Sequence, residues 1–135
     1  MTLTDAGVLV ALVDKGQPQN PRCRAIYLTA RLPLLTTWPA FAEAIYLLYR
    51  IGGWPLQRRL WQYVQEETLI FHASSTEEQL RMRELMEQYR DRPMDLADAS
   101  LVAAAEASGD KRIFTIDSDF YIYQWNGREP FEVVP

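Results

Sequence analysis

The stretch PMDLADASLVAAAEASG, residues 93–109, contains a predicted helix with an acid on its apolar face, and the predicted fold follows from what pairs with that acid. From Leu96 onward the stretch predicts a helix, yet Asp98 lies within an almost continuous apolar run. Leu101 and Val102 follow Asp98 at spacings of three and four, so they share its face of the helix. That face packs against the protein, where a carboxylate costs free energy unless something pairs with it. The rest of the sequence has to supply that partner.

Composition limits the answer to a single ordinary domain, residues 1–135. With 48% apolar and 24% charged residues, the chain is typical of a globular protein. The one cysteine, Cys23, excludes a disulfide framework and a thiolate metal cluster. The one histidine, His72, cannot form the histidine clusters of zinc sites, so we expect it to be structural.

The opening MTLTDAGVLVALVD, residues 1–14, has no basic leader and contains two acids, which argues against a signal peptide. No apolar run approaches the ~20 residues of a membrane span, so we expect a cytoplasmic protein without membrane contact. The net charge of −4 argues against wholesale nucleic-acid binding. Arginines nevertheless cluster locally, and a minority of them could line a groove for phosphates: Arg22 and Arg24; Arg50, Arg58 and Arg59; Arg81, Arg83, Arg90 and Arg92.

Strands and helices alternate along the chain, which predicts crossover connections and a parallel sheet. Apolar runs predict strands at residues 2–4, 32–37, 68–73, 111–117 and 131–134. Caps, prolines and glycines predict helices at residues 7–14, 21–31, 39–49, 55–67, 76–89 and 96–109. The predicted fold is a three-layer α/β/α sandwich with a mostly parallel central sheet of about five strands. Open sheets of this kind bind ligands outside the carboxyl ends of their strands.

Four acids from distant segments fall at that carboxyl edge. Asp5 and Asp117 each end a predicted strand, whereas Glu43 and Asp98 lie near the starts of helices that begin at the same edge. Each has a simpler interpretation: Asp5 as a helix cap, Asp117 as a turn residue, Glu43 as a solvated side chain and Asp98 as an acid favoured by the helix dipole. Asp95 is the better candidate for capping the last of these helices. Four unrelated structural roles for acids at one edge of the sheet are less plausible than one functional site that contains all four acids.

Carboxylates gathered this closely need protons or a cation. Two like charges ~4 Å apart repel by about 4 kcal/mol at an effective dielectric near 20. Hard divalent ions prefer oxygen ligands, so Mg²⁺ or Mn²⁺ fits better than zinc and would answer the question raised by Asp98. Such ions activate water and stabilise leaving oxygens, which predicts hydrolysis of a phosphodiester.

In this order the motifs resemble the PIN-domain ribonucleases, most closely the VapC-like toxins of bacterial toxin–antitoxin pairs. The resemblance lies in TDAGVLVALVD at residues 4–14, a helical glutamate after TTWP at 36–39, PMDLADASLVAAAE at 93–106 and FTIDSDFYIY at 114–123. It spans nearly the whole chain and implies an Mg²⁺- or Mn²⁺-dependent endonuclease acting on single-stranded RNA. It also implies an antitoxin partner whose basic segment occupies the acidic pocket, and a homodimer. Residues 54–63 either supply the dimer interface or place Trp54, Trp61 and Tyr63 on the core face of an amphipathic helix.

The resemblance also implies roles for individual residues. Asp5 matches the first acid of the family, Glu43 the second, Asp98 the third and Asp117 the fourth, as catalytic residues and metal ligands. Thr115 matches the hydroxyl residue that often precedes the last acid. The neighbouring acids Asp95 and Asp119 are either outer-shell ligands or solvated and capping acids. The rings of Tyr121, Tyr123 and Trp125 either stack on bases or pack in the core.

Other chemistries of α/β proteins find no support in the sequence. Neither a G-x-x-x-x-G-K-[ST] loop nor a G-x-G-x-x-G fingerprint is present. The first acid lacks the second acid, two places on, that haloacid-dehalogenase-like phosphatases use, and the last strand lacks the lysine of a phospho-receiver domain. The alternative that stays open is a catalytically silent binding module of the same fold, whose acidic pocket docks a basic segment of a partner.

Overall fold

The computed structural model describes residues 1–135 and contains a single five-stranded sheet with helices on both faces. The strands of this sheet are β1 (Thr2–Thr4), β2 (Leu34–Thr37), β3 (Leu69–His72), β4 (Arg112–Phe114) and β7 (Glu132–Val134). The helices are α1 (Ala6–Val13), α2 (Asn20–Thr29), α3 (Trp38–Gly52), α4 (Trp54–Gln65), α5 (Thr76–Gln88) and α6 (Leu96–Ser108). A 3₁₀ turn, η1 (Ser118–Tyr121), and a small hairpin of β5 (Gln124–Trp125) and β6 (Glu129–Pro130) follow β4.

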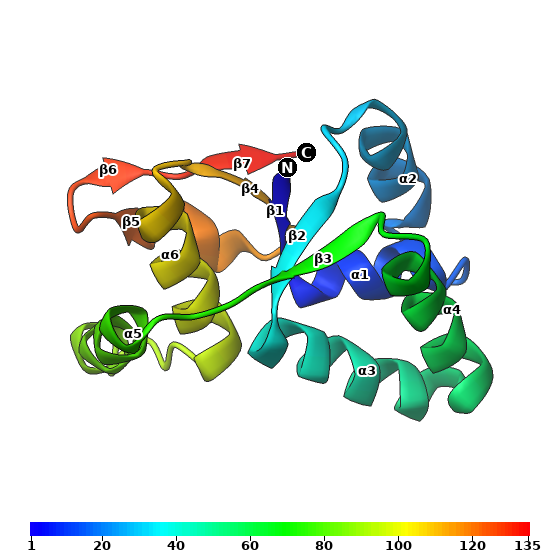
Figure 1. Ribbon diagram of the computed structural model, residues 1–135, viewed down its shortest axis with the longest axis horizontal. Coiled ribbons are helices and arrows are strands. Elements are labelled where there is room, and N and C mark those ends of the chain that lie inside the picture. The colour runs from blue at the N-terminus through cyan, green and yellow to red at the C-terminus, as the bar shows by residue number, and fades with distance from the viewer.

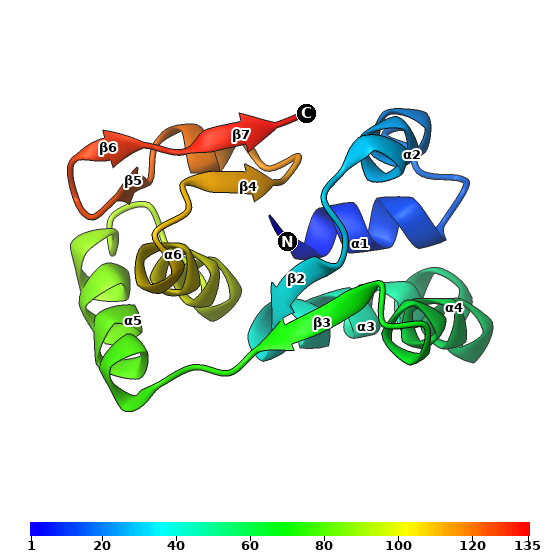
Figure 2. The same ribbon diagram turned by 45° about the horizontal axis from the view of Figure 1, so that its top comes forward.

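The central sheet has the strand order β3-β2-β1-β4-β7, and every neighbouring pair is parallel. Helices α5 and α6 lie on one side of the strands, and α1, α2 and α4 lie on the other (Figures 1 and 2). Helix α3 packs against α1, α4 and α6, so it connects the two sides beyond the end of β2. The predicted α/β/α fold with a mostly parallel sheet of about five strands is therefore confirmed.

Helix starts follow local capping chemistry. Thr37, Ser75 and Asp95 each accept a hydrogen bond from the backbone N–H three residues ahead, which satisfies one free donor of the first turn of α3, α5 and α6. The ends of α3 and α6 fall at Gly53 and Gly109, whose φ angles of 73° and 74° favour glycine.

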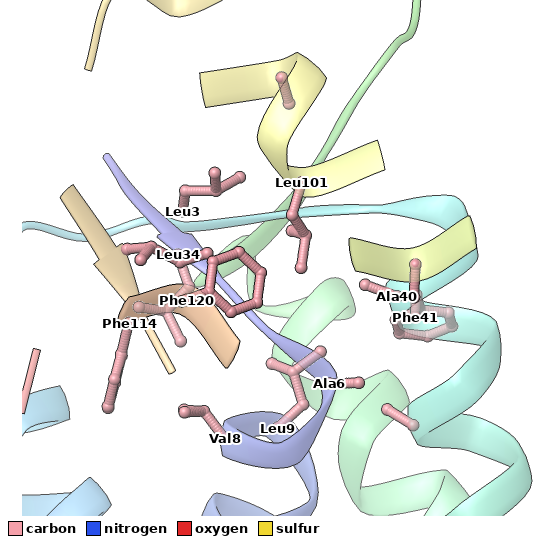
Figure 3. Packing of buried hydrophobic residues seen from close by; sticks show 14 of the residues in the cluster. Leu3, Ala6, Val8, Leu9, Leu34, Ala40, Phe41, Leu101, Phe114 and Phe120 are labelled. Atoms are coloured by element: carbon pink, nitrogen blue, oxygen red, sulfur yellow. The ribbon is translucent and has the colours of Figure 1, made fainter. Parts of the chain in front are cut away.

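The core lies between the sheet and the two helices that begin at its carboxyl edge. Helix α1 is buried on nearly all sides, because α2, α3 and α4 surround it. Helix α6 is buried from Ala97 to Ala105 between α3, α5 and the strands β1 and β2. Figure 3 shows Leu101 of α6 and Leu9 of α1 approaching Phe120, which is fully buried. Complete burial explains why these two segments lack the polar face of a surface helix.

Two features of the chain lie outside the predicted elements. The β5–β6 hairpin turns at Asn126 and Gly127, which have φ angles of 52° and 69°. The Asn-Gly pair is a hairpin signal that the sequence contained, but the flanking strands are only two residues long. Helix α3 also continues to Gly52, three residues beyond the predicted end. No helix in the structure combines the length and the apolar character needed to cross a bilayer.

Candidate metal centre

Asp5 lies immediately after β1, where the ladder between β1 and β4 ends. Its N–H donates to the carbonyl of Phe114 at 2.9 Å, which continues the strand pairing by one residue. Its Oδ1 accepts from the N–H of Ala6 at 2.7 Å, and its Oδ2 accepts from the Thr115 hydroxyl at 2.7 Å. Only 5% of Asp5 is exposed. Asp5 therefore both caps α1 and lies at the carboxyl edge of the sheet.

Asp117 is held by the loop that leaves β4. The N–H of Thr115 donates to Val134 on β7 at 2.9 Å, so the loop still follows the sheet at this point. The Thr115 hydroxyl donates to Asp5 and accepts from the N–H of Asp117 at 3.0 Å. Asp117 in turn caps η1, since its Oδ1 accepts from the N–H of Asp119 at 2.9 Å. One buried threonine thus fixes the relative position of two acids.

Asp98 points inward from the first turn of α6 and is only 7% exposed. Asp95 caps the helix and accepts from the N–H of Asp98 at 2.8 Å, as its sequence position suggested. The protein partner of the Asp98 carboxylate is Tyr123, whose hydroxyl donates to Oδ2 at 2.8 Å. No spacing rule predicts this contact from the sequence, because Tyr123 follows η1 and reaches Asp98 only through the folded chain.

The three aspartates converge at the carboxyl edge of the sheet. One carboxylate oxygen each from Asp5, Asp98 and Asp117 lies within 4.8 Å of the other two. Burial raises the pKa of Asp98 to about 8; the hydrogen bond from Tyr123 lowers this pKa, and the charges of Asp95, Asp5 and Asp117 raise it. Burial likewise raises the pKa of Asp5 to about 6, against the lowering effect of Thr115. The protein itself supplies no cation to this cluster.

The other predicted site acids surround this trio without joining it. Glu43, on α3, is half-buried and is not among the three acids within 4.8 Å. Burial raises the pKa of Glu43, and the charges of Asp95, Asp5 and Asp117 raise it too, so these acids interact electrostatically with Glu43. Asp95 is exposed, and Asp119 forms a 3.5 Å ion pair with Arg92.

The chemistry of the donors suits a hard divalent cation. All three converging groups are carboxylates, and the pKa values of two of them are raised, so a bound cation would relieve an existing electrostatic cost. The only histidine, His72, is engaged elsewhere, with its Nε2 2.6 Å from Glu78. Oxygen ligands without nitrogen or sulfur are typical of Mg²⁺ and Mn²⁺ rather than zinc.

The aromatic residues that follow the last acid have different environments. Tyr123 is 1% exposed and packs edge-on against Phe120 and Tyr89, so it belongs to the core. Trp125 is half-buried. Tyr121, in contrast, is 70% exposed.

Comparison with known proteins gives a family and a fold. A family model described as PIN domain matches residues 2–126. VapC20 from Mycobacterium tuberculosis, described as a toxin that cleaves the sarcin–ricin loop, superposes with a TM-score of 0.84 at 16% identity, covering 100% of both chains. A chain from a toxin–antitoxin complex of Klebsiella pneumoniae gives a TM-score of 0.68 at 16% identity, covering 89% of this chain and 90% of the other. The curated proteins contain no match.

Proposed function

The chain belongs to the PIN-domain family, and we propose that it is a divalent-metal-dependent endoribonuclease, the toxin of a type II toxin–antitoxin pair. The proposed reaction is hydrolysis of phosphodiester bonds in single-stranded RNA. The structurally similar VapC20 is described as a cleaving toxin, and the second similar structure as a toxin–antitoxin complex.

The observation that carries this proposal is the meeting of Asp5, Asp98 and Asp117 from three separate segments, with no cation of the protein between them. A cluster that served only stability would contain a counter-charge, because like charges at this distance repel one another. Buried acids whose pKa values are shifted in this way are typical of functional sites. The cluster lies outside the carboxyl ends of the strands, where open parallel sheets bind their ligands.

In the proposed mechanism Asp5, Asp98 and Asp117 hold Mg²⁺ or Mn²⁺, and Glu43 faces the same space. When bound, such an ion supplies activation of water and stabilisation of the charge that develops on the phosphate. Thr115 keeps the carboxylate of Asp5 oriented by donating to its Oδ2. Tyr123 does the same for Asp98, so a side-chain hydroxyl orients each of the two buried carboxylates. The Asp95 carboxylate accepts from the backbone N–H of Asp98, and the backbone N–H of Asp119 donates to Oδ1 of Asp117.

The test is cleavage of a pool of structured and unstructured RNAs in Mn²⁺. We expect activity that EDTA abolishes and that Asp5→Asn reduces to background. Asp91→Asn is the matched control, because Asp91 is exposed and makes no side-chain hydrogen bond or ion pair in the structure. If wild type and Asp5→Asn cleave equally, the activity comes from a contaminant or from another site, and the proposal is wrong.

A second function is favoured by the same acids. A basic segment of a partner, such as an antitoxin, would find three carboxylates and a raised-pKa glutamate with no cation among them. We propose that an antitoxin with a basic segment binds here and competes with the metal. If the purified protein cuts no RNA with any divalent ion, yet binds a basic peptide tightly, the chain is a binding module without catalysis.

We also propose that the protein forms a homodimer through the junction of α3 and α4. Tyr46, Tyr49, Ile51 and Trp54 are each between 47% and 62% exposed there. Trp61 and Tyr63, further along α4, are instead half-buried against the core. Sedimentation of wild type and Trp54→Glu tests this proposal: a dimer that the substitution dissociates supports it, and a monomeric wild type contradicts it.

A further inference from the structure

A small hollow adjoins the aspartate cluster on the side of β7 and α2. It has a volume of about 140 Å³, and both Thr115 and Asp117 form part of its wall. In both ribbon views the end of β7 points toward α2, so the hollow lies where these two elements approach each other (Figures 1 and 2). The volume is well below the roughly 300–1,000 Å³ of a self-contained small-molecule pocket. Its size and its position instead suit one part of a longer ligand that continues into the aspartate cluster.

Arg22 is the one cation among the nine residues that line the hollow. It extends from α2 as an exposed side chain, and none of the six ion pairs of the structure involves it. The arginine therefore stands beside a group of carboxylates without being neutralised by one of them. An unpaired guanidinium next to a proposed phosphodiester site has the charge and the planar donors that bind a phosphate oxygen.

Tyr121 forms another part of the same wall and is 70% exposed. It makes no side-chain hydrogen bond, and it does not pack against another ring, unlike its neighbour Tyr123. Exposing a ring of this size costs hydrophobic free energy, which core packing would have recovered. Exposed rings beside a positive charge are the usual platform on which proteins stack the bases of single-stranded nucleic acids.

We infer that this hollow is a nucleotide subsite for the residue next to the cleaved bond, where Tyr121 stacks on the base and Arg22 binds a flanking phosphate. This inference rests on the proposed ribonuclease function and adds the direction in which the strand leaves the aspartate cluster. Ser118 and Gln19, which also line the hollow, offer polar groups to the edge of the base. The subsite explains two residues that neither the fold nor the metal centre requires.

The experiment measures binding apart from cleavage. A labelled single-stranded oligoribonucleotide is titrated in EDTA against the Asp5→Asn protein, which we expect not to cut it, with and without each further substitution. Arg22→Gln is matched by Arg24→Gln, which removes the same charge from an exposed position on the same helix. Tyr121→Ala is matched by Leu80→Ala, which removes an apolar side chain that is 61% exposed on α5.

We expect Tyr121→Ala to weaken binding about five- to 150-fold without changing its salt dependence. Tyr121→Phe retains the ring and should restore affinity. Arg22→Gln should weaken binding and lower the slope of log K against log salt by about 0.7, the value for one phosphate contact to a single strand. In Mn²⁺, with Asp5 restored, the same two substitutions should raise KM far more than they lower kcat.

The outcomes separate this inference from the function on which it rests. If wild type cleaves RNA but the Arg22 and Tyr121 variants bind like their controls, the subsite is wrong and the ribonuclease stands. If wild type does not cleave RNA, yet binding still depends on both residues, the hollow is a nucleotide-binding site and the proposed catalysis is wrong. If Arg22→Gln weakens only the binding of an acidic peptide, the hollow is a protein-binding site and the inference is overturned.

Discussion

Helix α6 carries two largely buried acids that the protein treats in opposite ways. Glu106, near its carboxyl end, receives hydrogen bonds from the Nε and Nη2 of Arg81 at 2.9 and 3.0 Å. Asp98, near its amino end, meets two further aspartates and no cation. The first charge is neutralised within the fold, whereas the second is tolerable only with a proton or a ligand. The comparison separates an acid kept for stability from an acid kept for binding.

The largest expected effect distinguishes the two acids by activity. Asp98→Asn should lower cleavage in Mn²⁺ by at least about a hundredfold, comparable to the loss of one preorganised electrostatic group. Glu106→Gln should leave the rate per folded molecule close to that of wild type, since the Glu106 carboxylate is hydrogen-bonded to Arg81 and not to the aspartate cluster. Initial rates at saturating Mn²⁺ check this, with folding confirmed by circular dichroism. Equal losses in both variants would remove the distinction on which the comparison depends.

The second prediction concerns stability, for which Glu106 rather than Asp98 is the acid whose loss should destabilise the protein. Glu106→Ala leaves the guanidinium of Arg81 partly buried without its bidentate partner, which should cost about 1–3 kcal/mol of unfolding free energy. Arg83→Ala is the control, because its pair with Glu87 is largely exposed and should contribute less than about 1 kcal/mol. Urea denaturation of both variants measures the difference. Similar losses would show that burial does not strengthen the Arg81 pair.

The third prediction concerns pH in the metal-free protein. In the native state the pKa values of Asp5 and Asp98 are about 6 and 8, whereas an aspartate in the unfolded chain has a pKa of about 4. The native state therefore binds more protons in this range, so this contribution to stability is complete below pH 4 and is lost as the pH rises to 8. Asp98→Asn removes the larger part of this pH-dependent destabilisation, so the substitution should raise Tm in EDTA at pH 8 by several degrees.

Melting curves in EDTA between pH 4 and pH 8, for wild type and Asp98→Asn, check this dependence. The two curves should approach each other at the acidic end and diverge as the pH rises. An Asp98→Asn protein that melts at or below the wild-type temperature at pH 8 would show that the cluster is not electrostatically crowded.

The smallest expected effect comes from Tyr123→Phe. The substitution removes one hydrogen bond to the Asp98 carboxylate and should cost about 0.5–1.5 kcal/mol of stability. Because that hydrogen bond lowers the pKa of Asp98, its loss should shift the acidic limb of the pH–rate profile toward higher pH. Tyr121→Phe, which alters an exposed hydroxyl, should leave the profile in place. A profile that Tyr123→Phe does not move would mean that Asp98 is oriented by other contacts.

The helices, the main strands and their order could be predicted from local signals in the chain. Alternating apolar runs, the caps Thr37, Ser75 and Asp95, and the glycines at 53 and 109 act within a few residues, so local chemistry is sufficient to place them. Parallel pairing followed from the alternation of strands and helices, and it put Asp5 and Asp117 on one edge. The short β5–β6 hairpin was missed because two-residue strands give no periodicity.

Which side chains meet, in contrast, could be established only from the folded chain. Tyr123 reaches Asp98 across 25 positions, and Thr115 reaches Asp5 across 110, so no spacing in the sequence could reveal either hydrogen bond. The structure also distinguished Tyr121 from Tyr123, since exposure depends on what the rest of the chain covers. The physical reason is that capping and periodicity are local, whereas desolvation and pairing of charges depend on the whole fold.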